Sequence, residues 1–562
     1  MQDAYQEQYS GYEGHETWTN ALRMQFKMHL RITVVILLFF ILLATLFTCK
    51  VAKDNGLAVT ANNIRYLLQY GNKRPYFKLF IGAAILYPIA LIGFRKRARQ
   101  QSSKRHIRGA RLITPEELKK QIKKRKQATA IPFGQIEMPV DLENRATMII
   151  GKPGTGKSQC FRQIVKAIRK NGGQGIIYDH KGEYLTEFYD PQKDLIFNPL
   201  DRRSLGWNVF NELTTYMDVD AQAASLVPPS ISANDPFWND AARGVYAGCL
   251  HYLYQNDMRS NLHLWQMLTA EAKELSERLA KTKGGEAGYR YITQNVENSR
   301  QAESVLAVMM QYTRCFEYMA NTHGDFAITH WLSNGSGMIY ITNYEDVEET
   351  LRPILSLFID LVGRKLLSMA DNLNRRIYLL LDEFGSLQRM SSIVKMLTKG
   401  RSKGVSAFIG IQDDGQMEKT YGRQLLKTLD NAPGNRITFA LSGETAEREA
   451  KYNIGETEYF EIERSQSMGP SDYKDGTTLR NQKKKELLFL PSDIANLPDL
   501  TGIVKFRDYH FVISRWAYDK PRPIHSPFEL RNDLVLANIV AQQQRLRESV
   551  DQLEIQFSDS EE

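Results

Sequence analysis

The sequence predicts an α/β fold that carries a phosphate-binding loop, is interrupted by an all-α insertion and is preceded by two transmembrane helices. Three observations lead to this prediction. A glycine-rich loop lies between an apolar strand and an amphipathic helix, a long helical stretch separates two groups of apolar strands, and two apolar runs lie near the N-terminus. At 562 residues, the chain has room for roughly three to four structural units.

Two apolar runs predict a membrane anchor over residues 32–94. Residues 32–49, ITVVILLFFILLATLFTC, carry no charge and approach the length that a bilayer core requires. Residues 79–94, LFIGAAILYPIALIGF, form a shorter run, for which a buried soluble helix is the alternative. Two spans leave a short outer loop between them and place the polar segment 1–31 on the same side as the rest of the chain.

A basic stretch follows the second run and predicts its orientation. Residues 95–111 contain eight Lys or Arg and no acidic residue, and KKQIKKRK follows at 119–126. Basic flanks stay in the cytoplasm, so the sequence predicts a multi-pass protein whose bulk is cytoplasmic, with residues 95–130 as a juxtamembrane linker. The net charge of +9 favours an anionic partner, either nucleic acid or a lipid surface.

The cysteines predict neither a zinc site nor a disulfide framework, because they are far apart and form no CxxC pair. We expect free thiols in a reducing compartment. Cys160 directly follows the glycine-rich loop, where it is either a reactive thiol or a small buried hydrophobe.

The α/β pattern occupies residues 131–207 and 331–530. Residues 146–150 predict a strand, 158–170 an amphipathic helix and 173–179 a second strand, which makes a βαβ start. Strands resume at 337–342, 375–383, 405–412 and 436–441, and 502–516 predicts an antiparallel hairpin. Between them, residues 208–330 show helical spacing and predict the all-α insertion. Residues 531–562 predict a C-terminal helix and an acidic tail.

The glycine-rich loop matches the phosphate-loop pattern in full, as Gly151, four residues, then Gly156, Lys157 and Ser158. Its glycines let backbone N–H groups point at phosphate oxygens from a helix N-terminus. We expect Lys157 to bridge the β- and γ-phosphates and Ser158 to bind Mg²⁺. The expected nucleotide-binding residues are Gly151, Pro153, Gly154, Thr155, Gly156, Lys157 and Ser158.

A carboxylate pair ends the apolar strand IYLLLDE. We expect Asp382 to hold Mg²⁺ and Glu383 to activate the attacking water as general base. An acidic pair that merely caps a strand is the alternative. The pair favours hydrolysis, and the chain contains no NKxD-like guanine motif, so ATP and Mg²⁺ are the expected cofactors.

Two further residues are candidates for catalysis. Gln412 ends another apolar strand, where its amide could sense the γ-phosphate. Arg401 lies in a turn before that strand and could reach the nucleotide of a neighbouring subunit as an arginine finger. The alternatives are a strand cap for Gln412 and a solvated loop charge for Arg401.

Several segments together resemble the type IV secretion coupling proteins of bacterial conjugation, in the TraD (TrwB-like) branch. They are RGARL, GKPGTGKS, YDHKGEY, FNPLDRRSLGWNVF, DPFWNDAARGVYA, LLLDEFGSL, GRSKGVSAFIGIQ and LPDLTGIVKF. The resemblance runs from about residue 32 to 522.

The resemblance implies an ATPase of the bacterial inner membrane that forms a homo-hexameric ring of RecA-like domains, with the all-α domain at its cytoplasmic mouth. Such a ring receives relaxase-bound DNA, single- or double-stranded, and protein substrates, and delivers them to the inner-membrane components of the secretion channel. By matching position, Lys157, Ser158, Asp382, Glu383, Gln412 and Arg401 take the roles given above.

A DNA-conducting ring predicts basic residues that meet phosphates without reading sequence. The candidates are Lys395, Lys399, Lys403 and Lys483 to Lys485, each with a solvated surface charge as the alternative. Two other functions stay open. One is a docking receptor in which nucleotide serves assembly only, and the other is an FtsK/HerA-like DNA translocase. The acidic end FSDSEE is either a docking tail for a relaxosome protein or a solubilising end.

Overall fold

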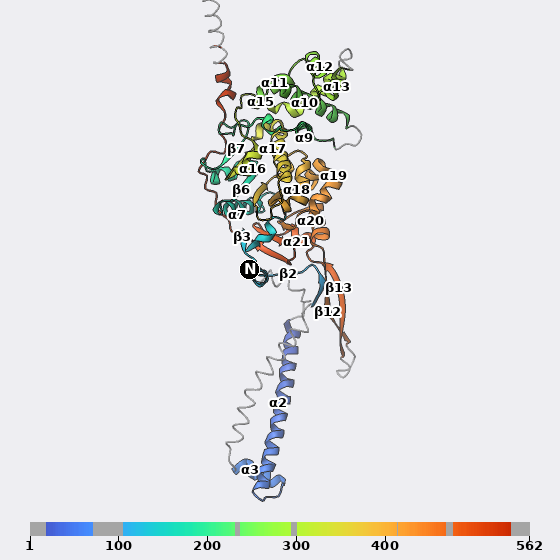
Figure 1. Ribbon diagram of the computed structural model, residues 1–562. Helices are drawn as coiled ribbons and strands as arrows, with labels where there is room; N and C mark the ends of the chain where they lie inside the picture. The colour runs from blue at the N-terminus through green and yellow to red at the C-terminus, as the bar shows by residue number, and fades with distance from the viewer. Residues whose placement is uncertain are drawn as a thin grey trace, which may run out of the picture. The chain divides into compact units, whose positions relative to one another are not determined.

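The computed structural model describes residues 18–70, 105–230, 236–293, 300–412, 414–467, 476–540 and 544. They belong to two units, one made of residues 1–109 and 456–486 and the other of residues 110–455 and 487–562. Figure 1 labels the elements of both units along the chain.

The first unit contains a long apolar helix, α2 (Trp18–Asp54). Its part Thr33–Asp54 has a mean hydropathy of 2.7 and is long and apolar enough to cross a membrane. The helix begins at Trp18, well before the predicted start of the span at residue 32, and α3 (Ala61–Tyr70) follows it. The predicted second span, 79–94, and residues 1–17 lie outside the described residues. The described part of the chain therefore contains one candidate span.

The first unit also holds a three-stranded sheet that the sequence did not predict. Its strands are β1 (Arg105–Gly109), β12 (Glu456–Ser467) and β13 (Gly476–Leu487), in the order β1-β12-β13. β1 runs antiparallel to β12, so part of the predicted linker is a strand. The two long strands are mostly polar, and therefore lack the alternation of apolar residues that marks a half-buried strand.

The second unit is built on a ten-stranded sheet whose order is β2-β15-β14-β11-β5-β10-β9-β6-β8-β7. The strands are β2 (Leu112–Ile113), β5 (Thr147–Ile150), β6 (Gln174–Asp179), β7 (Leu195–Phe197), β8 (Met338–Thr342), β9 (Ile377–Leu381), β10 (Val405–Ile411), β11 (Asn435–Thr438), β14 (Thr501–Lys505) and β15 (Phe511–Arg515). From β11 to β7 the strands are parallel, and β14 and β15 form the predicted antiparallel hairpin. The predicted α/β fold is confirmed.

The strand register aligns three functional segments at one edge of this sheet. β10 lies between β5 and β9, with Ile411 opposite Ile150 and Ile409 opposite Leu381. The residues that follow these strands are Gly151, Gln412 and Asp382, so all three leave the sheet at its carboxyl edge. Ligands of parallel α/β sheets bind at this edge.

Helix α5 (Pro115–Lys124) corrects the predicted boundary at residue 131. Its Leu118 and Ile122 are buried in the same core as strand residues such as Ile149. Two apolar residues four positions apart suffice to fix one helix face, although lysines dominate the composition. The part of the predicted linker from residue 110 onward therefore belongs to the nucleotide-binding unit.

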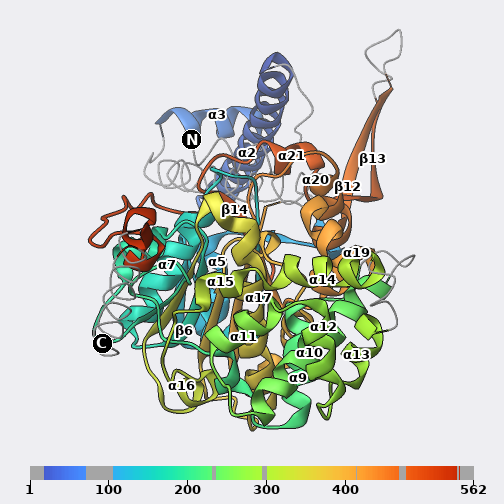
Figure 2. The ribbon, with the colours of Figure 1, turned by 90° about the horizontal axis from the view of Figure 1, so that it is seen from above.

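Most of the residues between β7 and β8 form helices, as predicted. They are α9 (Tyr216–Leu226), α10 (Phe237–Gln255), α11 (Asn261–Leu268), α12 (Ala272–Ala280), α13 (Glu286–Thr293), α14 (Arg300–Thr313), α15 (Cys315–Met319) and α16 (Ile328–Asn334). α10 packs against α9, α13 and α14, and its predicted apolar positions Ala241, Val245 and Cys249 are fully buried. Figure 2 shows these green helices gathered together, with α10, α12 and α13 adjacent.

Shorter elements and three longer helices complete the second unit. They are β3 (Thr129–Phe133), β4 (Ile136–Pro139), α6 (Val140–Glu143), α7 (Lys157–Lys170), α8 (Glu183–Phe188), α17 (Glu348–Ser368), α18 (Ser391–Lys399), α19 (Asp414–Asn431), α20 (Gly443–Arg448) and α21 (Pro491–Ala495). After β15 the chain contacts both α8 and the insertion, because Ile524 N donates to Thr186 O at 2.7 Å and Arg531 Nη1 to Tyr318 O at 2.8 Å. Most of the predicted C-terminal helix and tail lies outside the described residues.

Candidate nucleotide site

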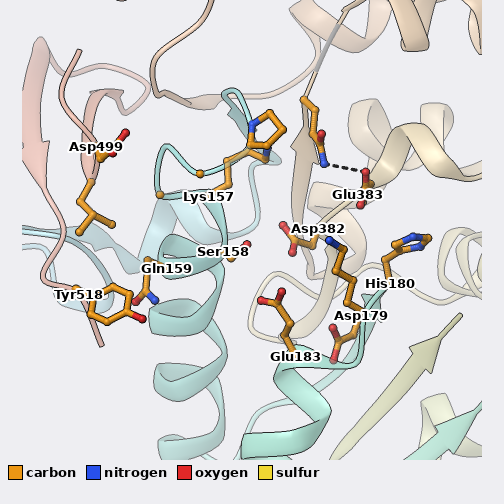
Figure 3. A pocket seen from close by; sticks show the side chains of 16 residues that line it. Lys157, Ser158, Gln159, Asp179, His180, Glu183, Asp382, Glu383, Asp499 and Tyr518 are labelled. Carbon is orange, nitrogen blue, oxygen red and sulfur yellow. Dashed lines mark hydrogen bonds between the residues drawn. The ribbon is translucent and has the colours of Figure 1, made fainter. Parts of the chain in front are cut away.

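A cavity of about 500 Å³ lies at the carboxyl edge of the ten-stranded sheet. It brings together eight residues that the sequence predicted for the site, from three strand ends that are far apart in sequence (Figure 3). They are Pro153, Gly154, Gly156, Lys157, Ser158, Asp382, Glu383 and Gln412. Gly151 and Thr155, also predicted, shape the loop and do not line the cavity.

The phosphate loop has a conformation that requires glycine. Gly154 and Gly156 have φ of +81° and +122°, which L side chains rarely adopt. A Cβ on Gly156 would also lie 3.2 Å from Leu500 Cα. The loop is held at both ends, since Gly151 N donates to Ile411 O at 3.2 Å and Thr155 Oγ1 donates to Lys152 O at 2.7 Å. The loop therefore wraps around an open space in front of helix α7.

Lys157 is the first residue of α7 and points back into the loop. Its Nζ donates to Gly151 O at 2.7 Å, and the side chain is 7% exposed. Burial lowers the pKa of Lys157, whereas the charges of Asp382 and Glu383 act in the opposite direction. A phosphate in the loop would replace the carbonyl as partner of this ammonium and complete its charge balance.

The buried face of α7 holds the loop in place. The predicted apolar positions Phe161, Ile164, Val165 and Ile168 are at most 1% exposed. Cys160 is fully buried beside them, and burial raises the pKa of its thiol. The prediction of a small buried hydrophobe is confirmed, and the four cysteines are free thiols.

Asp382 is held by a tyrosine that the sequence did not single out. The Tyr184 hydroxyl donates to Asp382 Oδ2 at 2.6 Å, and Tyr184 is buried whereas Asp382 is partly exposed to the cavity. Burial raises the pKa of Asp382 to about 6, although the Tyr184 hydrogen bond and the Lys157 charge lower it. A bound cation would keep this carboxylate ionised. The donor set of Ser158 hydroxyl and Asp382 carboxylate consists of the oxygen ligands that Mg²⁺ prefers, so the site fits that ion.

Asp179 is a second buried carboxylate of the site. Its Oδ2 accepts from Tyr184 N and from Leu185 N, each at 2.8 Å, and burial raises its pKa to about 7. It fixes the start of α8 and hence the position of the Tyr184 ring. One signal in the sequence could have found it, because Asp179 is the last residue of the apolar strand β6 and Asp382 directly follows the apolar strand β9.

Glu383 and Gln412 are in direct contact. Gln412 Nε2 donates to Glu383 Oε1 at 2.7 Å, and both residues line the cavity (Figure 3). The predicted sensor and the predicted general base therefore form one hydrogen-bonded pair. A change at either side chain must change the orientation of the other.

Other lining residues were missed at the sequence level. They are Gln159, Asp179, His180, Lys181, Glu183, Asp499, Leu500 and Tyr518. Asp499, Leu500 and Tyr518 come from the β14–β15 region, over three hundred residues after the phosphate loop. Only the fold brings them to α7.

Arg401 lies away from this cavity. It precedes β10, whereas Gln412 follows it, and a seven-residue strand spans roughly 20 Å. Arg401 lines a separate cavity of about 430 Å³ with Asn144 and Arg376. Burial lowers the pKa of Arg145, and the charges of Arg401 and Arg507 lower it further, so three arginines lie near each other here. Arg401 cannot serve the site of its own subunit in this arrangement.

The lysines proposed as pore contacts differ in their surroundings. Lys483 and Lys484 have carboxylate partners on β12, Glu458 at 2.8 Å and Glu461 at 2.6 Å, and Lys485 pairs with Glu456.

Lys403 pairs with Asp371 at 2.7 Å. Lys395 and Lys399 are exposed on α18, and the described part of the chain offers them no ion-pair partner. Of the candidates, these two have positive charge that is free to meet phosphate.

Comparison with known proteins identifies related chains. Residues 130–513 match the family model described as the type IV secretion-system coupling protein DNA-binding domain. Coupling protein TraD of Escherichia coli (strain K12) is 28% identical over 416 residues, which is 72% of this chain and 57% of TraD. The chain thus spans somewhat more than half the length of this relative.

Solved structures show the same relationship. Unbound bacterial conjugative coupling protein TrwBdeltaN70 is 28% identical, with a TM-score of 0.68 over 76% of this chain and 97% of that one. Plasmid coupling protein TrwB in complex with ADP and Mg²⁺ is 27% identical, with a TM-score of 0.67 over 76% of this chain and 98% of that one.

Proposed function

Since the chain belongs to the type IV secretion-system coupling protein family, we propose that it is a membrane-anchored ATPase that couples DNA to a secretion channel. It recruits relaxase-bound DNA and protein substrates and passes them to the inner-membrane components of the channel. The apolar part of α2 serves as its anchor in the bacterial inner membrane, with the second unit in the cytoplasm.

One observation carries the ATPase proposal. Lys157 and Ser158 of the phosphate loop share a cavity with Asp382 and Glu383, and these side chains can bind the phosphates, hold Mg²⁺ and activate water. The neighbouring Gln412, bonded to Glu383, adds a group that can respond to the γ-phosphate.

Different residues bind the phosphates, hold Mg²⁺ and activate water. Loop N–H groups and the Lys157 ammonium hold the phosphates, and the partial positive charge at the start of α7 favours them. Mg²⁺, when bound between Ser158 and Asp382, supplies positive charge for the β- and γ-phosphate oxygens. Glu383 takes a proton from the attacking water. The Gln412 amide orients the Glu383 carboxylate while the γ-phosphate is bound, and this contact can change once the γ-phosphate has left.

The position of Arg401 supports catalysis between subunits. In a homo-hexameric ring of RecA-like units, the edge that carries Arg401 faces the nucleotide of the next subunit, and its guanidinium completes that site. DNA binds without sequence preference through exposed lysines such as Lys395 and Lys399, so its affinity falls steeply with salt.

Two variants of the full-length chain in detergent test the proposal. Lys157→Ala should lose ATP hydrolysis because the phosphates lose their main cation. Glu383→Gln should bind ATP like the wild type yet hydrolyse it at least about 100-fold more slowly, as expected when a general base is removed. Hydrolysis by Lys157→Ala at the wild-type rate would contradict the assignment of the site. Undiminished DNA transfer in cells by Glu383→Gln would favour a docking receptor over a motor.

A further inference from the structure

Tyr518 presents a free aromatic ring at one end of the nucleotide cavity. Its side chain is 65% exposed, whereas Trp516, two residues earlier, is 4% exposed. No other Phe, Tyr or Trp is among the described residues that line the cavity. Ligand pockets are lined mainly by hydrophobic and aromatic side chains, so an exposed ring at this cavity is a candidate ligand contact.

The backbone on both sides of Tyr518 is tied to the phosphate-loop region. Trp516 N donates to Leu500 O at 2.8 Å, and Leu500 N donates in turn to Thr155 O at 2.9 Å. The Trp516 ring also lies 4.8 Å from the ring of Phe439, centroid to centroid. These contacts fix the chain just before the tyrosine.

Asp519 is clamped by the amide of Gln159, from the first turn of α7. Asp519 N donates to Gln159 Oε1 at 3.0 Å, and Gln159 Nε2 donates to Asp519 O at 3.1 Å. Lys166 Nζ adds an ion pair at 2.8 Å to Asp519 Oδ2. The backbone beside Tyr518 is therefore held from both sides, so little conformational entropy is lost when its ring meets a ligand.

The residues at the two ends of the cavity indicate how a nucleotide would be oriented in it. Asp382 and Glu383 lie on one side of the start of α7, and Tyr518 lies on the other, next to Gln159 (Figure 3). The reacting γ-phosphate belongs beside the carboxylates and the loop takes the phosphates, so the opposite end of a nucleotide reaches Tyr518. That end is the purine base.

We propose that Tyr518 is the base-binding residue of this site and that it acts by stacking on the purine ring. The proposal rests on nucleotide binding at the loop, as put forward above. The Gln159 amide lies next to the ring (Figure 3), and its two hydrogen bonds with the Asp519 backbone fix its orientation. Stacking accepts any base with an aromatic face. The site therefore holds ATP and GTP by the same contact.

Equilibrium binding to the full-length chain in detergent with Mg²⁺ tests this role. The ligands are ATP, GTP and inorganic tripolyphosphate, which has no base. Tyr518→Ala should lower the affinity for ATP and the affinity for GTP by a similar factor of roughly 5 to 100, which is the range for loss of one base–aromatic stack. Its affinity for tripolyphosphate should stay within about twofold, and Tyr518→Phe should bind all three ligands like the wild type.

Tyr452→Ala is the matched control, because this tyrosine is 80% exposed and does not line the cavity. Unchanged ATP affinity in Tyr518→Ala would overturn the proposal. So would loss of ATP affinity alone with GTP unaffected, or an equal loss in Tyr518→Phe, since either result assigns the contact to something other than the ring. A wild-type chain that binds none of the ligands would instead refute the nucleotide site itself.

Discussion

Tyr184 holds two carboxylates of the candidate site, one of which is the proposed Mg²⁺ ligand Asp382. Its hydroxyl donates to Asp382, and its backbone N–H donates to the buried Asp179, so one residue fixes the positions of both carboxylates. Groups that orient a metal ligand affect the metal nearly as much as the ligands do.

We expect Tyr184→Phe to raise the Mg²⁺ concentration needed for half-maximal ATPase activity by about 10-fold or more, because Asp382 loses the hydroxyl that orients it. A magnesium titration of the ATPase rate measures this. Tyr340→Phe is the control, since that buried hydroxyl contacts Arg169 at 3.4 Å and lies outside the cavity. Equal magnesium requirements in the two variants would show that the hydroxyl does not position Asp382.

At the scale of elements, helix α17 connects the insertion to the nucleotide-binding unit through one buried carboxylate. Asp360 on α17 accepts from Ser225 Oγ of α9 at 2.5 Å and from Ser392 N of α18 at 2.9 Å, and it is fully buried. Arg364 adds a contact at 3.2 Å. Three helices therefore share one anion, and without it the backbone N–H of Ser392 would lose its acceptor.

Asp360→Ala should lower the midpoint of thermal unfolding by about 5 °C, because a buried hydrogen-bonded charge whose partners stay behind costs about 3 kcal/mol. Differential scanning calorimetry of the full chain measures the midpoint. Asp346→Ala, at an exposed carboxylate just before α17, should leave it unchanged. A midpoint of Asp360→Ala equal to that of the control would mean that the helices are held by apolar packing alone.

Helix α18 and strand β13 both carry lysines, yet only those on α18 are without carboxylate partners in the described residues. We expect the double variant Lys395→Ala, Lys399→Ala to bind duplex DNA more weakly, with a plot of log affinity against log salt whose slope is shallower by about 2. Fluorescence anisotropy over a salt series measures both. The pair Lys403→Ala, Asp371→Ala removes one ion pair without changing net charge and should keep the slope. An unaltered slope in the α18 variant would exclude these lysines as phosphate contacts.

At the scale of the whole molecule, the role proposed for Arg401 requires a second copy of the chain. The nucleotide site and Arg401 lie at opposite ends of β10, so one chain cannot bring them together. In the proposed ring of identical chains, each copy would present the edge that carries Arg401 to the site of the next copy.

Mixing two inactive variants tests this arrangement. Lys157→Ala and Arg401→Ala should each lose most ATPase activity, and co-assembled full-length chains should recover part of it. Some sites would then combine an intact Lys157 with an Arg401 from the neighbouring copy. The ATPase rate of separately purified and co-expressed chains gives the comparison. If co-expression restores nothing while both chains are present in one complex, Arg401 does not act between subunits.

Local runs of apolar residues explain which predictions succeeded and which features were missed. The phosphate loop and the carboxylate pair were found because each follows a short run of apolar residues, and parallel strands end at a common edge. Tyr518 and Tyr184 gave no such signal, since nothing local marks an exposed or a buried tyrosine. Strands β12 and β13 were missed because cross-strand ion pairs, here between lysines and glutamates, do not produce a period of apolar residues.

Sequence alone determined the α/β class, the helical insertion, the apolar helix near the N-terminus, and the choice of Lys157, Ser158, Asp382 and Glu383, which the structure brings into one cavity. These are local patterns, and local periodicity and backbone chemistry specify them. Only the tertiary structure decided that Gln412 holds Glu383, that Tyr184 holds Asp382, and that Arg401 lies at the far edge of the sheet. Strand order and register decide such contacts, and these depend on pairings between residues hundreds of positions apart.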